Sequence, residues 1–243
     1  MNFYLDIGNS RLKSACDSTT GLQPFRPVAW RDVSLSEHLD QLWAGYKPSD
    51  MFVCNVAEQS VLDHLESWCK TNWQLDPQIL ASTSEFKGLR NGYHKPETLG
   101  TDRWAAMVGA RVQYAGGLCV IDSGTATTVD LIDANGLHLG GAILPGVYTM
   151  RRALGKYTAS LFTTSGDIEP FSRDTAAGIA GGTGYASAGA IDRLIDEGIA
   201  RLGELTVVFT GGEAALVAPL LRHQVIVDEL LVLSGVAALA EDS

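Results

Sequence analysis

Two similar turns, far apart in the chain, constrain the fold of this sequence more than any other feature. Residues 6–10 read DIGNS and residues 122–126 read DSGTA, and an apolar stretch precedes each turn. The two aspartates are 116 positions apart in a chain of 243 residues. Because similar patterns of expected strands follow both turns, we infer a duplicated domain with its boundary near Gly116.

The alternation of apolar residues predicts a meander of three strands at the start of each half. In the first half we expect strands over 3–7, 12–16 and 25–30, a helix from Ser34 with a capping box to Glu37, a strand over 51–56 and a helix over 58–72. In the second half we expect strands over 118–122, 127–132 and 137–143, followed by a helix after Pro145 and a helix over 175–201. A strand over 205–210, a helix after the GGE segment that begins at 211, and a short strand near 225–227 complete this half. The expected domains are residues 1–116 and 117–228, and a last apolar helix, about 229–243, packs back on the first domain.

The helix expected over 175–201 is crowded with glycine and alanine. Each glycine costs a helix up to about 1 kcal/mol relative to alanine, so some other contact has to offset that cost. Small side chains allow the backbones of two helices to approach closely. We therefore expect a second helix, from this chain or from a partner subunit, to pack against this segment.

Charge and cysteine content limit the partners and the compartment. The formal net charge of −10 and the isoelectric point near 4.9 disfavour nucleic acid and anionic membranes as partners. The four cysteines form no Cys-x-x-Cys pair, which favours buried thiols in a reducing compartment. The N-terminus lacks the pattern of a signal peptide, and no apolar run reaches the roughly 18 to 20 residues that cross a bilayer. We expect a cytoplasmic protein.

The two repeated turns carry groups that bind phosphate. In DIGNSRLK, residues 6–13, the Gly8-Asn9 turn exposes backbone N–H groups, Ser10 offers a hydroxyl, Lys13 a cation, and Asp6 a carboxylate that could hold Mg²⁺ through water. In DSGTATT, residues 122–128, hydroxyls replace the lysine. Each turn alone is equally well explained as an ordinary hairpin, but their repetition favours a pair of turns that clamps a polyphosphate such as ATP.

A third segment, LGTDRWAAMVGA at 99–110, places Asp102 and Arg103 at the start of an apolar helix. If Thr101 caps the helix, both charged residues lie in its first turn, where the helix dipole favours a carboxylate. Simple capping by Asp102 with a solvated Arg103 is the alternative. The preceding polar loop, which carries Tyr93 and His94, favours a small-substrate site next to Asp102.

Together these segments resemble one family, the type III pantothenate kinases of the actin-like, Hsp70-like and sugar-kinase superfamily. The residues that carry the resemblance are DIGNSRLK at 6–13, GTDR at 100–103, DSGTATT at 122–128, GGAILPG at 140–146 and the segment from Asp174 to Asp192. The resemblance implies an α/β fold of two duplicated ribonuclease H-like domains with ATP in the cleft between them. It also implies phosphorylation of pantothenate, the first step of coenzyme A biosynthesis, and a homodimer that needs Mg²⁺ and a monovalent cation, K⁺ or NH₄⁺.

The family pattern also implies roles for individual residues. It makes Asp102 the general base and gives Asp122 to the monovalent cation. The ATP-binding residues it implies are Asp6, Ile7, Gly8, Asn9, Ser10, Arg11, Leu12, Lys13 and Thr125. The pantothenate-binding residues it implies are Tyr93, Gly100, Thr101, Asp102, Arg103 and, across a dimer interface, Thr175.

Two positions depart from the family pattern: Ser10 stands where threonine is usual, and Asp174 where asparagine is common. Both substitutions keep a hydrogen-bonding group. Two other functions remain open from the sequence. One is a kinase of another hydroxylated small molecule. The other is a kinase-inactive or moonlighting relative that acts as an accessory factor to a transcriptional regulator, since residues 88–105 also resemble such a subgroup.

Overall fold

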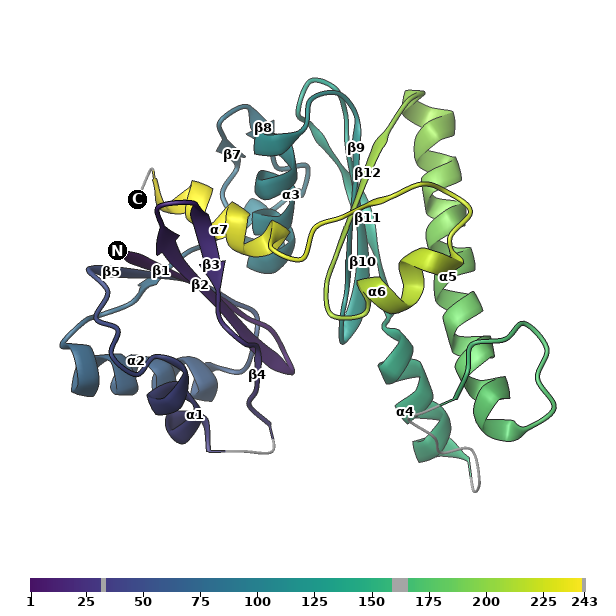
Figure 1. Ribbon diagram of the computed structural model, residues 1–243. Helices are drawn as coiled ribbons and strands as arrows, with labels where there is room; N and C mark the ends of the chain where they lie inside the picture. The colour runs from purple at the N-terminus through teal and green to yellow at the C-terminus, as the bar shows by residue number, and fades with distance from the viewer. Residues whose placement is uncertain (32–33, 159–165, 242–243) are drawn as a thin grey trace. The chain divides into compact units, whose positions relative to one another are not determined.

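The computed structural model describes residues 1–31, 34–158 and 166–241. These residues form two compact units, which Figure 1 shows as two separate sheets with their helices. The first unit contains residues 1–113 and the segment from Leu230 onward, and the second contains residues 114–229. The first unit therefore takes up both ends of the chain.

The first unit is built on a sheet with the strand order β3-β2-β1-β5-β6. Strand β1 is antiparallel to β2 and parallel to β5, and the short strand β4 pairs with β2 beside β3. The strands are β1 (Asn2–Ile7), β2 (Arg11–Ser18), β3 (Gly21–Pro24), β4 (Val28–Ala29), β5 (Asp50–Asn55) and β6 (Gln78–Ile79). The other elements are α1 (Leu35–Leu42), α2 (Gln59–Trp73), the hairpin β7 (Glu85–Phe86) and β8 (Leu89–Arg90), the 3₁₀ turn η1 (Pro96–Thr98), α3 (Thr101–Gln113) and α7 (Leu231–Ala240).

The second unit repeats this strand order as β11-β10-β9-β12-β13. Strand β9 is antiparallel to β10 and parallel to β12, just as β1 is to β2 and β5. The elements are β9 (Leu118–Ser123), β10 (Ala126–Ile132), β11 (His138–Pro145), α4 (Val147–Tyr157), α5 (Thr175–Leu202), β12 (Thr206–Thr210), α6 (Ala214–Val217), the 3₁₀ turn η2 (Ala218–Leu220) and β13 (Ile226–Val227). The shared order confirms the duplication that the two turns predict.

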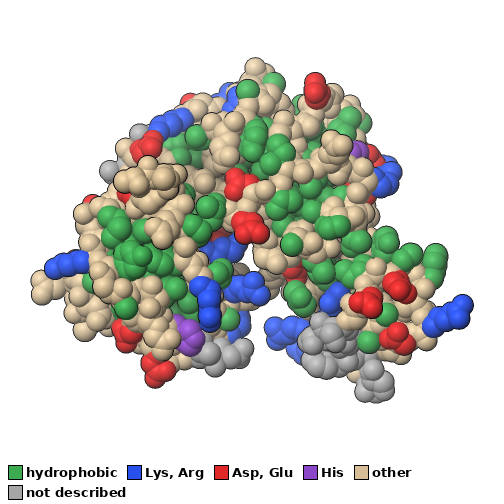
Figure 2. Space-filling model, in the orientation of Figure 1, with side chains coloured by type: hydrophobic (Ala, Val, Ile, Leu, Met, Phe, Trp, Pro, Cys, Tyr) green, Lys and Arg blue, Asp and Glu red, His purple; other side chains and the backbone are tan. Residues whose placement is uncertain are grey.

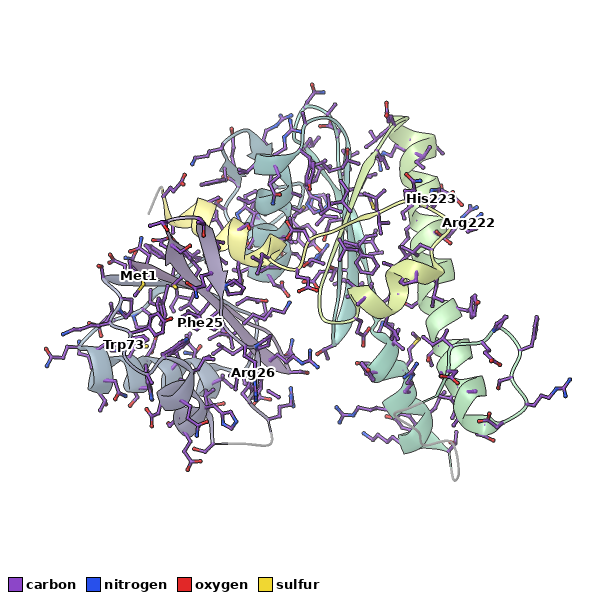
Figure 3. The ribbon with its side chains drawn as sticks, viewed as in Figure 1. Met1, Phe25, Arg26, Trp73, Arg222 and His223 are labelled. Atoms are coloured by element: carbon purple, nitrogen blue, oxygen red, sulfur yellow. The ribbon has the colours of Figure 1, made fainter. Side chains whose placement is uncertain are left out.

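Helices cover both faces of the first sheet, so β1 is buried almost from end to end. Phe3 points toward α1 and α2, and its ring centroid lies 5.2 to 5.8 Å from those of Phe25, Trp43, Tyr46 and Trp73. Figure 3 shows Phe25 and Trp73 on this side of the sheet. The opposite face is covered by α7, and α3 packs against α7. The central strand is thereby fixed, and with it the turn that follows β1.

Two glycines allow α3 and α7 to touch through their backbones. A Cβ atom at Gly235 would lie 1.8 Å from the carbonyl oxygen of Ala105, and one at Gly109 would lie 2.3 Å from that of Leu231. Real Cβ atoms do not approach a backbone oxygen so closely. The helix that carries Asp102 is therefore held at a distance that only glycine permits.

The second unit has its own apolar core on one face of its sheet. Ile121 and Phe209 point from the sheet toward Ile191 and Ile195 of α5, and all four are fully buried. All four cysteines of the chain are buried free thiols, as expected. Burial raises the pKa of Cys69 and of Cys119 to about 12, so both thiols stay protonated at neutral pH.

The structure corrects three details of the predicted secondary structure. The strand expected over 25–30 is replaced by β3 and β4, because Pro24 and Pro27 have no N–H group with which to continue a ladder. Ser34 does precede α1, but its side chain makes no capping hydrogen bond. The helix expected after the GGE segment is only α6, which continues as the 3₁₀ turn η2 at Pro219. Residues 242–243 of the expected last helix lie outside the described residues.

Among the described residues, no helix is both long enough and apolar enough to span a membrane.

Candidate functional site

The first repeated turn joins β1 to β2 and carries the candidate phosphate-binding groups. Asp6 is 6% exposed near the end of β1 and lies directly opposite Lys13 of β2, so the carboxylate and the ammonium group share one face of the sheet. The N–H of Gly8 donates to the carbonyl oxygen of Arg11 at 3.0 Å, which closes the turn. Asn9 is exposed at its tip. The turn is thus a rigid hairpin end with a cation beside it.

The start of α3 positions Asp102. The carbonyl of Gly100 accepts the N–H of Trp104 at 3.0 Å, so the first helical hydrogen bond begins at Gly100. The Oδ1 atom of Asp102 accepts the N–H of Arg103 at 2.7 Å, and the side chain of Asp102 is partly exposed. A Cβ atom at Gly100 would lie only 2.6 Å from this Oδ1 atom. The glycine therefore leaves room for the carboxylate to fold back over the helix end.

Thr101 does not cap the helix, contrary to the expectation from the sequence. Its hydroxyl donates to the carbonyl oxygen of Asn55 at 3.2 Å, at the end of β5. The N–H of Val56 in turn donates to the carbonyl of Ile7 at 3.0 Å, at the end of β1. These two bonds bring the start of α3 and the first turn together at the carboxyl ends of β1 and β5, the edge where α/β sheets commonly bind ligands.

A loop supplies Tyr93 to the same region. Arg103 is 5% exposed, and its Nη1 atom donates to the hydroxyl of Tyr93 at 2.6 Å. Asn91 shapes the loop, because its Oδ1 atom accepts the N–H of Tyr93 and its Nδ2 atom donates to the carbonyls of Thr83 and Pro96. Tyr93, Gly100, Thr101, Asp102 and Arg103 thus form one cluster, as the family resemblance implies for a substrate site.

The second repeated turn, between β9 and β10, is held by bonds to α4. The carbonyl of Thr125 accepts the N–H of Gly146 at 3.1 Å and the hydroxyl of Thr149 at 2.6 Å. Asp122 occupies the position that Asp6 has in the first unit, directly opposite Thr128 of β10 and Thr210 of β12. Hydroxyls therefore flank Asp122 on both neighbouring strands.

The pattern of the type III pantothenate kinase family matches residues 2–197 of this chain. The chain belongs to the type III pantothenate kinase family. A type III pantothenate kinase from Nitrosococcus oceani is 37% identical to it over 252 residues, which cover 100% of this chain and 95% of the relative.

Comparison with solved structures shows which fold this chain has. A Campylobacter jejuni protein assigned to the Baf family of transcriptional activators matches with a TM-score of 0.59 and 24% identity, over 99% of this chain and 98% of that one. An archaeal actin homologue matches with a TM-score of 0.53 and 12% identity, over 100% of this chain and 99% of that one. The chain has the two-domain α/β fold of the actin-like ATPases.

Thr175, the remaining residue that the family pattern implies, lies away from the second turn. It is exposed at the start of α5, where Asp174 caps the helix by accepting the N–H of Ala177 at 3.0 Å. Thr175 lines an apolar groove of about 750 Å³ between α4 and α5, together with Met150, Leu154 and Tyr157. No contact within the described residues of the second unit joins Thr175 to the turn at Asp122.

Sequence reasoning missed Glu213, the residue that fastens the second turn. This carboxylate is 4% exposed and accepts the N–H groups of Val147 at 2.8 Å and Tyr148 at 3.0 Å, at the start of α4. Its Oε2 atom also accepts the hydroxyl of Ser123 at 3.2 Å. The only sequence signal was an acidic residue after two glycines, which is typical of many exposed loops. Sequence reasoning also assigned no role to Trp30 and Arg31, which contact the first turn.

Proposed function

We propose that this protein transfers the γ-phosphoryl group of ATP to the primary hydroxyl of pantothenate, forming ADP and 4′-phosphopantothenate in the first step of coenzyme A biosynthesis. One observation carries the proposal: in a chain that belongs to this family, the carboxylate of Asp102 stands at the start of α3, beside the carboxyl ends of β1 and β5. The same edge of the sheet carries the Asp6–Lys13 turn.

Asp102 acts as the general base. Its carboxylate accepts the proton of the pantothenate hydroxyl as that oxygen attacks the γ-phosphorus and the bond to the β-phosphate oxygen breaks. Phosphoryl transfer demands little covalent chemistry from a protein, so positioning and charge stabilisation carry most of the catalysis. The partial exposure of Asp102 supports this role, because a base has to reach its substrate.

ATP binds at the two repeated turns, at residues 6–13 and at Thr125. Lys13 and the backbone amides of the first turn hold the phosphates, and Asp6 holds Mg²⁺ through water. Mg²⁺ is commonly bound by one or two carboxylates together with the phosphates of its substrate, so a single carboxylate such as Asp6 is a suitable protein ligand. Bound Mg²⁺ supplies positive charge that neutralises the phosphate oxygens.

Asp122 binds the monovalent cation, K⁺ or NH₄⁺. The proposal is supported by Thr210, which lies directly opposite Asp122 on β12. The Oγ1 atom of Thr210 is fully buried and has no hydrogen-bond partner among the described residues, which is costly for a polar atom unless a ligand satisfies it. Carboxylate and hydroxyl oxygens are suitable ligands for K⁺.

Pantothenate binds between the loop at Tyr93 and the start of α3. Gly100, Thr101 and Asp102 contact the hydroxyl end of pantothenate, and Arg103 binds its carboxylate or amide. The partly buried hydrogen bond between Arg103 and the hydroxyl of Tyr93 supports this assignment, since it holds the guanidinium and the phenol as a preformed pair.

Two copies of the chain form a homodimer through α5, and Thr175 contacts pantothenate across that interface. The open space around Gly182 and Gly189 on α5 supports the dimer, because, apart from the neighbouring backbone of α5 itself, no described atom lies within 4 Å of a Cβ atom built at either position. The apolar groove between α4 and α5 offers the partner a surface to bury. The reaction takes place in the cytoplasm, which suits four free thiols.

A substrate panel tests this function. Purified protein is incubated with ATP, Mg²⁺ and K⁺, and ADP formation is measured with pantothenate, with a set of sugars and without an acceptor. We expect ADP to form only with pantothenate, and much more slowly when Na⁺ replaces K⁺. Equal turnover in the two salts would contradict the Asp122 assignment, and a strong preference for a sugar would refute the pantothenate assignment.

A further inference from the structure

Two side chains from one short segment hold the first turn from outside. The indole Nε1 of Trp30 donates to the carbonyl oxygen of Gly8 at 2.9 Å, and the Nε of Arg31 donates to that of Asn9 at 2.6 Å. The segment is placed by β4, whose Ala29 pairs with Arg11 of β2. Two successive carbonyls of the turn are therefore bound by neighbouring residues, and the turn cannot change shape without breaking these bonds.

The hydrogen bond to Asn9 engages only the Nε atom of the Arg31 guanidinium. Its Cζ atom lies 5.0 Å from the centroid of the Trp30 ring, so the group rests on the indole while Nε binds Asn9. Arg31 is exposed, and its two terminal amino groups make no hydrogen bond or ion pair within the described part of the chain. They keep four N–H donors in a fixed plane beside the turn.

The local charge also points to an anion. Lys13 lies opposite Asp6 across the β1–β2 ladder, so a carboxylate already faces that cation. No described acidic side chain forms an ion pair with Arg31, although the whole chain carries a formal charge of −10. Figure 2 shows Lys and Arg side chains gathered over this end of the first unit, near the tip of the β1–β2 hairpin. An oriented arginine that has no ion-pair partner among the described residues, next to a phosphate-binding turn, is typical of an anion site.

We propose that Arg31 is a phosphate-binding residue of the ATP site, which donates from its terminal amino groups to the polyphosphate held at the first turn. Trp30 is its positioning residue, since the indole supports the guanidinium and fixes the Gly8 carbonyl. This inference rests on the proposed function, because it assumes that the first turn binds ATP. Lysine could not replace Arg31 fully, since it lacks the planar pair of donors and stacks less well on an indole.

Calorimetric titrations of ATP, ADP and adenosine test the proposal. The variants are Arg31→Gln, Arg31→Lys and Trp30→Phe, and Arg26→Gln is the matched control. Arg26 is an exposed arginine of the same segment that makes no hydrogen bond or ion pair with described residues, and Figure 3 labels it beside β4. The amide introduced by Arg31→Gln can still donate to the Asn9 carbonyl, so this variant removes the charge with the least damage to the turn.

We expect Arg31→Gln to weaken ATP binding by about 10-fold or more, in line with the loss of a charge-assisted hydrogen bond, and to leave adenosine binding unchanged. Arg31→Lys and Trp30→Phe lose less, and Arg26→Gln binds like the wild type. Thermal unfolding confirms that each variant is folded.

Two results would overturn the proposal while the proposed function stands. One is wild-type ATP affinity in Arg31→Gln. The other is an equal loss of ATP and adenosine affinity in that variant, which means that Arg31 only shapes the turn. If the wild-type protein binds no ATP at all, the proposed function and this inference both fail.

Discussion

Asp102 is held by the residues on either side of it. The N–H of Arg103 donates to its carboxylate, and Gly100 leaves the space that the carboxylate occupies. Two short contacts within four consecutive residues therefore help to fix its conformation. Such contacts can be disturbed one at a time, without touching the core.

Gly100→Ala should lower turnover and leave the fold intact. The added Cβ atom would lie 2.6 Å from Oδ1 of Asp102, so the carboxylate has to move. Misplacing a catalytic group by about 1 Å can cost roughly 100-fold in rate, and we expect a loss of about 10- to 100-fold in kcat. Steady-state kinetics measure the loss, and chemical denaturation should show a stability change of less than about 1 kcal/mol. An unchanged kcat would mean that the position of Asp102 is not what matters.

Some site residues could be foreseen from sequence and others could not. Asp6, Lys13 and Asp102 stand out because the period of a strand or the start of a helix fixes where they lie. Glu213 and Arg31 do not stand out, because each binds a segment that is distant in the sequence. Glu213 accepts the N–H of Val147, and Arg31 donates to the carbonyl of Asn9. Nothing local in the sequence encodes those contacts.

At the scale of elements, the crossing of α3 and α7 decides where the site lies. Gly109 and Gly235 let the two backbones touch, and α7 itself packs on β1 and β5. Composition indicates a buried last helix, but only the tertiary contact reveals which helix it meets and why two glycines are needed. In α5, by contrast, composition predicts a close helix contact, but Gly182 and Gly189 meet no neighbouring element among the described residues.

Gly235→Ala should destabilise the first unit. The new methyl group would overlap the carbonyl of Ala105, and backbone atoms cannot move aside as a flexible side chain can. Overpacking of this kind costs about 1 to 3 kcal/mol, so the urea midpoint should fall. Gly124→Ala is the matched control, because a Cβ atom built there meets no other described atom within 4 Å, and it should change the stability by less than about 0.5 kcal/mol. Equal effects of the two substitutions would contradict this account of the crossing.

At the scale of the whole molecule, one strand order occurs twice and places a carboxylate near the end of each central strand. The repeat was visible in the sequence because its two turns kept their aspartate and glycine. The short strands β6, β7 and β8 were not predicted, since two residues carry no periodicity, whereas the short strand expected near 225–227 is confirmed as β13. Asp6 and Asp122 are equivalent by topology, yet Asp6 lies opposite a lysine and Asp122 opposite a threonine.

The central claim is that this chain phosphorylates pantothenate with Asp102 as its base, and one comparison tests it most directly. Wild-type protein and Asp102→Asn are each incubated with pantothenate, ATP, Mg²⁺ and K⁺, and 4′-phosphopantothenate is measured by mass spectrometry, with ATP affinity measured in parallel. We expect the wild type to form the product and Asp102→Asn to form at least about 100-fold less, at nearly unchanged ATP affinity. Substantial product from Asp102→Asn would contradict the role of Asp102, and a folded wild type that forms none would contradict the function itself.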